Sequence, residues 1–177
     1  STRGSNRLSE CLHETQALPR YALYYAPRAE EPLAVAGSRW LGRNADTGET
    51  RDLVPVSGMP SERMSAIIAD PRLYGFHGTL KPPIVLAEGA TERDFVGAVG
   101  AFAATERQID VPALVLAELH DFLALVPAER CTALQDFSDR CVVEFDEFRR
   151  PAGEAELARR RAAGLTQRQE DLLLRWG

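Results

Sequence analysis

The segment Tyr74 to Lys81, YGFHGTLK, carries side chains whose types and spacing could move protons near a phosphate. Side chains alternate between the faces of a β-strand, so His77, Thr79 and Lys81 would share one face. Histidine titrates near neutral pH, threonine offers a hydroxyl and lysine a cation, which together suit acid–base chemistry at a phosphoryl group. A strand with a solvated polar face gives the same local pattern, so the pattern alone leaves both interpretations open.

The geometry of this segment leads to a specific expectation. We expect His77 and Thr79 to point into one concave pocket. On the opposite face, Phe76 and Leu80 should pack under a helix.

The remaining histidines and cysteines offer weaker chemistry. His13 lies in a polar opening stretch and is interpreted as solvated, and His120 falls at a predicted hairpin turn. Cys11, Cys131 and Cys141 lack CxxC spacing and are interpreted as free thiols. The sequence therefore predicts no metal site and no cofactor.

Composition limits the class of protein and the kind of partner. With 177 residues, 45% of them hydrophobic and 27% charged, the chain fits one soluble globular domain. The net charge of −5 argues against duplex nucleic acid as a partner but is compatible with a small anionic substrate. No apolar run is long enough to span a membrane, and the opening lacks the apolar core of a signal peptide, so we expect a cytoplasmic protein. The oligomeric state stays open.

Strands and helices mix without regular βαβ alternation, which predicts an α+β fold with a mainly antiparallel sheet. We expect residues 1–19 to form a polar extension and residues 20–177 a single domain. In the helix predicted at 32–41, the inner face should carry Leu33, Val35 or Ala36, and Trp40. The predicted strands are 20–26, 73–81, 113–119 and 122–126, with 84–86 continuing the second after a bend; the predicted helices are 32–41, 60–69, 91–106, 128–150, 154–163 and 167–176; and 43–58 is a loop.

The motif His77-Gly78-Thr79-Leu80 resembles the H-x-T-hydrophobic motif of the 2H phosphoesterase superfamily, which includes LigT-like cyclic phosphodiesterases. The similarity is to a branch often encoded beside phosphonate-degradation genes, and it extends over nearly the whole chain from Arg20 onward. The segments that carry it are 20–27, 38–43, 74–83, 122–127 and 156–176.

This resemblance implies a bilobed α+β fold in which each half contributes one H-x-T strand to a central cleft. It implies that His77 is a general acid or base, that Thr79 binds the phosphoryl group and that Lys81 is a further phosphate contact, without metal or cofactor. After His120, Phe122 stands where the motif requires a hydroxyl. We therefore expect the second H-x-T strand, which would complete the second lobe, to follow Gly177.

Two further residues are weaker candidates for substrate binding. Tyr24 is an aromatic residue of the first predicted strand, and Arg39 lies in the first predicted helix. The run Arg159–Arg161 is interpreted as a solvated helix face.

The leading hypothesis is a metal-independent phosphoesterase acting on a small cyclic or nucleotide-derived phosphodiester. One alternative is a non-catalytic phosphate- or nucleotide-binding protein of the same fold. Another is an interaction module without a site.

Overall fold

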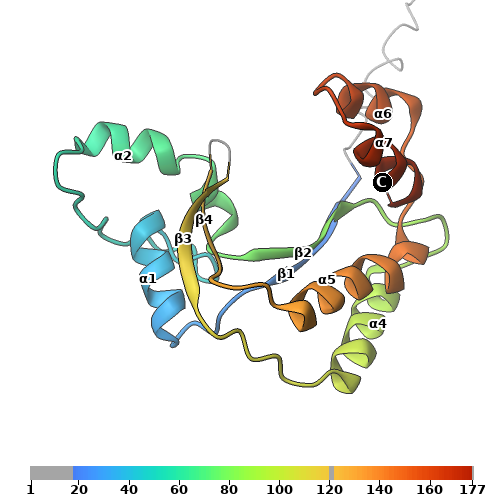
Figure 1. Ribbon diagram of the computed structural model, residues 1–177, viewed down its shortest axis with the longest axis horizontal. Helices are drawn as coiled ribbons and strands as arrows, with labels where there is room; N and C mark the ends of the chain where they lie inside the picture. Colours follow the sequence, from blue (N-terminus) through green and yellow to red (C-terminus); the bar gives the residue numbers. More distant parts are fainter. Residues whose placement is uncertain (1–17, 120–121, 177) are drawn as a thin grey trace, which may run out of the picture.

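The computed structural model describes residues 18–119 and 122–176, and Figure 1 shows their arrangement. Helices combine with two antiparallel pairs of strands, β1 with β2 and β3 with β4, which confirms the predicted α+β class. Cys11, His13 and His120, whose roles were interpreted from the sequence, lie outside the described part of the chain. The elements are β1 (Tyr21–Tyr25), α1 (Pro32–Leu41), α2 (Ser61–Ile68), α3 (Pro71–Tyr74), β2 (Gly78–Ile84), α4 (Glu92–Thr105), β3 (Leu114–Leu119), β4 (Phe122–Pro127), α5 (Thr132–Glu144), a 3-10 turn (Asp146–Phe148), α6 (Glu154–Arg161) and α7 (Gln167–Trp176).

The larger core lies where α4 and α5 pack against the β1–β2 pair (Figure 1). Its buried members come from β2, α4, α5 and the residue after α5, namely Ile84, Phe95, Cys141 and Phe145. The rings of Phe95 and Phe145 meet edge to face, with centroids 5.9 Å apart. Edge-to-face packing sets the positive ring edge against the negative face, so this core fixes the orientation of the two helices as well as their contact.

Helices α4 and α7 begin within one residue of their predicted starts, and a pair of capping residues precedes or opens each helix. At the start of α4, the Asp94 amide donates to the Thr91 hydroxyl at 3.2 Å, while the Thr91 amide donates to the Asp94 carboxylate at 3.1 Å. Thr166 and Gln169 make the equivalent pair of contacts before α7. These bonds satisfy amides that have no partner within the helix, so they depend only on residues three apart.

A second, smaller core joins α1 and α2. Its buried members are Leu41, Met64 and Ile68, and Phe76 packs against them. The predicted inner face of α1 was wrong: Val35 and Trp40 are exposed, and the buried positions are Ala34, Gly37 and Leu41. The reason is close approach, because a Cβ atom on Gly37 would lie 2.6 Å from the Phe76 side chain.

Strand β2 begins later and extends further than its sequence predicts. The predicted start at Leu73 is helical, as part of α3, and the strand runs through Pro82 and Pro83 to Ile84. In the register with β1, Lys81 pairs with Leu23 and Ile84 with Tyr21, so neither proline has a paired position. Proline lacks an amide hydrogen and is tolerated in a strand at such irregular points.

The helix predicted over 128–150 is shorter than expected. Helix α5 begins at Thr132 and ends at Glu144, and a 3-10 turn follows it. Phe145, between α5 and this turn, is buried in the larger core, and Phe148 packs against that core from the turn, so the apolar residues in the range predicted as one helix belong to more than one element. No helix in the described ranges is long and apolar enough to cross a membrane.

The Gly37 contact gives a test of how α1 is placed. Gly37→Ala should destabilise the protein by about 1 to 3 kcal/mol, because the added methyl group overlaps Phe76. Gly97→Ala, within α4, is the matched control, since its Cβ would meet nothing within 4 Å. That control should stabilise the helix by about 0.5 to 1 kcal/mol, and urea denaturation measures both. Equal effects of the two substitutions would contradict the packing described here.

Candidate functional site

Three of the five predicted site residues come together at the start of β2. Thr79 pairs directly with Tyr24 across the antiparallel register, which puts their side chains on one face. The His77 ring, just before the strand, lies against the Tyr24 ring with centroids 4.0 Å apart and planes inclined by 31°. Tyr24, His77 and Thr79 are therefore neighbours on the same face of the sheet.

The backbone before His77 fixes the orientation of its ring. His77 Nδ1 lies 2.9 Å from the carbonyl oxygen of Gly75. Because a carbonyl oxygen only accepts hydrogen bonds, Nδ1 carries the hydrogen and Nε2 keeps its lone pair in the neutral ring. The arrangement leaves Nε2 as the nitrogen that can exchange a proton with a ligand.

Gly75 is a site residue that the sequence analysis missed. Its φ of +77° is in a region that other residues rarely adopt, and a Cβ atom there would lie 2.4 Å from the Cβ of Ala45. A glycine two residues before a candidate catalytic histidine was the available signal. Its backbone carbonyl, and not a side chain, is what holds the imidazole.

The structure corrects the placement of Lys81, which the alternating pattern put beside His77 and Thr79. The register with β1 advances one residue, from Tyr24 to Leu23, while β2 advances two, from Thr79 to Lys81. This β-bulge interrupts the alternation, so Leu80 and Lys81 both turn to the face covered by α5.

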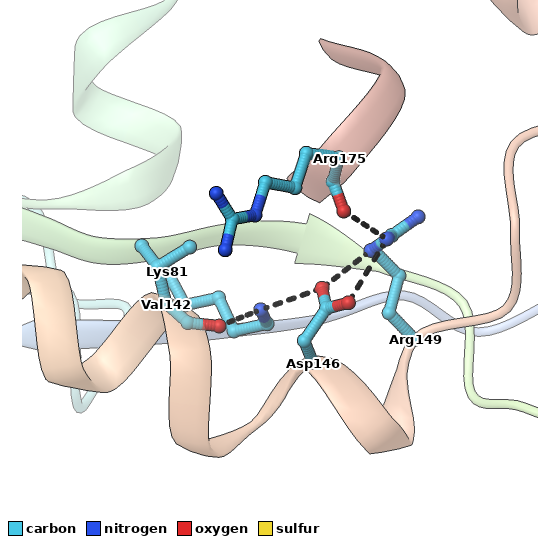
Figure 2. Close-up of polar contacts among 5 residues, drawn as sticks. All are labelled: Lys81, Val142, Asp146, Arg149 and Arg175. Atoms are coloured by element: carbon cyan, nitrogen blue, oxygen red, sulfur yellow. Dashed lines mark hydrogen bonds and ion pairs between the residues drawn. The ribbon is translucent and has the colours of Figure 1, made fainter. Parts of the chain in front are cut away.

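On that face, Lys81 is 1% exposed and its ammonium group has two protein partners (Figure 2). Nζ donates to the Val142 carbonyl at 2.8 Å and lies 3.6 Å from Asp146 Oδ1. Val142 is among the last four residues of α5, whose carbonyls have no amide partner within the helix. Lys81 thus caps the carboxyl end of α5, where the helix dipole favours a cation.

Asp146 connects this lysine to a second cation. Arg149 Nε donates to Asp146 Oδ1 at 2.7 Å, and an Nη atom of Arg149 donates to Oδ2 at 3.0 Å and to the Arg175 carbonyl at 3.3 Å (Figure 2). Burial lowers the pKa of Lys81, although the charge of Asp146 opposes the shift. Burial alone would raise the pKa of Asp146, but hydrogen bonds from Arg149 and the nearby cations bring it below its ordinary value.

The structure does not join Arg39 or the expected pocket to the group formed by Tyr24, His77 and Thr79. Arg39 is exposed in the last turn of α1, and no hydrogen bond or ion pair links it to His77 or Thr79 among the described residues. Two cavities elsewhere in the structure are not lined by His77 or Thr79, and the concave pocket expected around these two residues stays a prediction. The described residues hold no group of three or more His, Cys, Asp or Glu side chains suited to a metal.

Asp146→Asn tests the buried charge network. At pH 7 it should lower the free energy of unfolding by about 3 kcal/mol, because it leaves the Lys81 ammonium buried with one neutral partner. The folded state lowers the pKa of Asp146, so its stabilisation is present above the ordinary carboxyl pKa of about 4 and is lost as the pH falls through the lowered value. Denaturant unfolding from pH 7 to pH 3 should therefore show the difference from the unaltered protein shrinking in acid.

Asp136→Asn, at an exposed position of α5, is the control and should change stability little at any pH. An equal loss for both variants at pH 7 would rule out the special role of Asp146.

Two curated proteins resemble the chain over most of its length. One is "Ribose 1,5-bisphosphate phosphokinase PhnN" of Janthinobacterium sp. (strain Marseille), 42% identical over 163 residues, which are 92% of this chain and 36% of that protein. The other bears the same name in Laribacter hongkongensis (strain HLHK9) and is 33% identical over 160 residues, 89% of this chain and 36% of that protein. The chain thus spans about a third of the length of these relatives. No solved structure matches it.

A family match covers the carboxyl-terminal part of the chain. Residues 79–177 match the family described as "Protein of unknown function (DUF1045)". The matched region begins at Thr79 and includes Lys81 together with the whole of α5, so it contains the charge network at the end of that helix. Since the match covers more than half of the chain, the protein belongs to the DUF1045 family.

Proposed function

We propose that the protein is a metal-independent phosphoesterase that hydrolyses a small cyclic or nucleotide-derived phosphodiester. The observation that carries this proposal is the fixed imidazole of His77, held at Nδ1 by Gly75 and against the Tyr24 ring, with Nε2 available beside Thr79. The resemblance of His77-Gly78-Thr79-Leu80 to the 2H phosphoesterase motif supports the same reaction. We also propose a role in phosphonate metabolism, as for the branch that the sequence resembles.

In the proposed reaction, the oxygen of a water molecule bonds to phosphorus and one phosphorus–oxygen ester bond breaks. One group removes the proton of the water, and another protonates the departing alkoxide. His77 Nε2 takes one of these roles, because an imidazole both accepts and donates a proton near neutral pH. The Thr79 hydroxyl, exposed on the same face, donates a hydrogen bond to a phosphoryl oxygen.

One imidazole does not serve both sides of the phosphorus at once. His77 is the single histidine among residues 18–119 and 122–176, so we place the second proton-transfer group outside the described residues. Lys81 has no direct part in this proposal, because its ammonium group is bound to Val142 and Asp146 on the opposite face. Its contribution is to hold β2 against α5, which helps to position Thr79 on the opposite face of the strand.

The two relatives are named as phosphokinases, and we do not extend that activity to this chain. The chain corresponds to about a third of each relative. Its one lysine, Lys81, lies between Leu80 and Pro82, outside the Gly-Lys-Ser/Thr context of a phosphate-binding P-loop. The name does support a phosphorylated pentose as the kind of molecule handled near this protein, so ribose cyclic phosphates belong in the substrate panel.

Replacing His77 gives the most direct test of the proposal. His77→Ala should lower kcat by about 10² to 10⁴ with little change in substrate affinity, because proton transfer contributes mainly in the transition state. Thr79→Val should remove about 1 to 3 kcal/mol of binding to the phosphoryl group. The measurement is hydrolysis of 2′,3′-cyclic nucleotides and ribose cyclic phosphates by the unaltered protein and both variants.

Tyr25→Ala serves as the control, since Tyr25 is the exposed neighbour of Tyr24 on β1 and should leave turnover unchanged. Full activity of His77→Ala on a substrate that the unaltered protein turns over would refute the assigned role. If the protein binds phosphate esters but hydrolyses none of them, the non-catalytic binding protein replaces the phosphoesterase.

The proposal also predicts the effect of removing metal ions. Hydrolysis should continue at an unchanged rate after treatment with a chelator, because the proposed chemistry uses an imidazole, a hydroxyl and water. The comparison is the initial rate before and after dialysis against EDTA. A rate that falls and is restored by a divalent ion would show that a metal takes part.

A further inference from the structure

A cavity of about 130 Å³ lies at the far end of β2, away from His77. Its walls come from residues 81–85, from the segment 149–153 that leads into α6, and from Arg20, Glu156, Arg160 and Trp176. The chain from His77 to Lys81, the first residue of β2 that lines the cavity, extends about 13 Å at roughly 3.3 Å per residue. Neither His77 nor Thr79 lines the cavity, so it is separate from the proposed catalytic residues. At about 30 Å³ per water molecule, it has room for one phosphate-sized group.

The charge of this cavity is opposite to that of the whole chain. Five basic residues line it, and Glu156 is the one carboxylate among the lining residues. Asp146 lies beside two of the cations, so the local balance stays positive, whereas the chain carries −5 overall. The basic residues are Arg20, Lys81, Arg149, Arg150 and Arg160.

The five basic residues differ in how many protein partners their charged groups already have. Lys81 and Arg149 are committed to Asp146. Arg20 donates one hydrogen bond, to the Pro83 carbonyl at 3.0 Å, and Arg160 pairs with Glu156 at 2.8 Å. Arg150 is exposed, and its guanidinium has no hydrogen-bond partner among the described residues. A guanidinium has five N–H donors, so Arg20, Arg150 and Arg160 retain donors for a ligand.

Two further features favour an anion here. Gly153, the N-cap of α6, lines the cavity and has no side chain to cap the first amides of the helix. Hydrogen bonding from Arg160 and the nearby charges of Arg160, Arg20 and Arg159 hold the pKa of Glu156 below its ordinary value. The direction of this shift agrees with a positive electrostatic potential around Glu156. The carboxylates of Glu154 and Glu156, in the first turn of α6, oppose this effect in part.

From this arrangement we infer that the cavity binds the phosphate group of a small phosphorylated ligand through Arg20, Arg150 and Arg160. The run Arg159–Arg161 was interpreted from the sequence as a solvated helix face, and the structure places Arg160 of this run in the lining of the cavity. The inference does not depend on the proposed phosphoesterase activity, because His77 and Thr79 have no part in the cavity.

Trp176 lines the cavity and provides a local signal for binding. The chain has two tryptophans, and the other, Trp40, is exposed on α1, so Trp40→Phe leaves Trp176 as the single indole reporter. Inorganic phosphate titrated into this variant at constant ionic strength should change its fluorescence in a saturable way. Chloride over the same range should not.

Substitutions in the Trp40→Phe background then identify the site. Arg150→Ala should weaken phosphate binding about tenfold or more, since it removes a charge-assisted hydrogen bond. Arg63→Ala, which removes an exposed arginine of α2, is the matched control and should leave the affinity unchanged. Glu156→Gln should tighten binding, because it removes the one lining carboxylate and releases Arg160. His77→Ala should have no effect.

An absent fluorescence change, or equal affinities for Arg150→Ala and Arg63→Ala, would overturn the assignment. Loss of the signal in His77→Ala would also overturn it, by showing that the anion binds at the other site. A retained phosphate site in a protein that hydrolyses no cyclic ester would refute the proposed function and leave this inference standing.

Discussion

The ammonium group of Lys81 is removed from water between β2 and the carboxyl end of α5, and much of the structure follows from how its charge is satisfied. A buried cation is tolerated only with close partners, here the free carbonyl of Val142 and the carboxylate of Asp146. Because Asp146 belongs to the turn after α5, the contact fixes where the helix ends. Arg149 shares the carboxylate and reaches the Arg175 carbonyl, so the same network joins α7 to this end of the molecule.

The β-bulge between Thr79 and Lys81 divides β2 into two parts whose side chains serve different faces of the sheet. Before it, Thr79 faces the same side as Tyr24 and His77; after it, Lys81 and Ile84 face the core under α4 and α5. A regular strand would bring the lysine out beside the histidine and leave the end of α5 without its cap. The irregular pairing therefore allows one short strand to serve both the proposed catalytic face and the core.

A backbone carbonyl and close packing around two glycines help to place His77. The Gly75 carbonyl fixes the ring nitrogen, and the left-handed conformation of Gly75 is compatible with its contact to Ala45 only without a Cβ atom. Phe76, the next residue, packs on Gly37 of α1. Two glycines distant in sequence thus set the position of the histidine, through steric limits that tolerate no larger side chain.

The sequence alone determined the features that depend on neighbouring residues. Strand β1, helix α1, the start of α4 and the strands β3 and β4 all lie close to their predicted positions, because helix caps, chain breakers and the alternation of side chains act within a few residues. The grouping of His77 with Thr79 also followed from the two-residue period. Tyr24 was singled out, but its contact with His77 depends on strand pairing across the sheet.

Tertiary structure decided what depends on residues far apart in the chain. The register of β1 against β2 placed the bulge and turned Lys81 into the core, where Asp146 and Val142 lie more than sixty positions away in sequence. Close packing selected Gly37 and Ala34 over Trp40 and Val35 as the inner face of α1, since hydrophobicity ranks side chains but does not report the space available to them. The cationic cavity likewise gathers arginines from Arg20 to Arg160, and no local pattern relates charges that only the folded chain brings together.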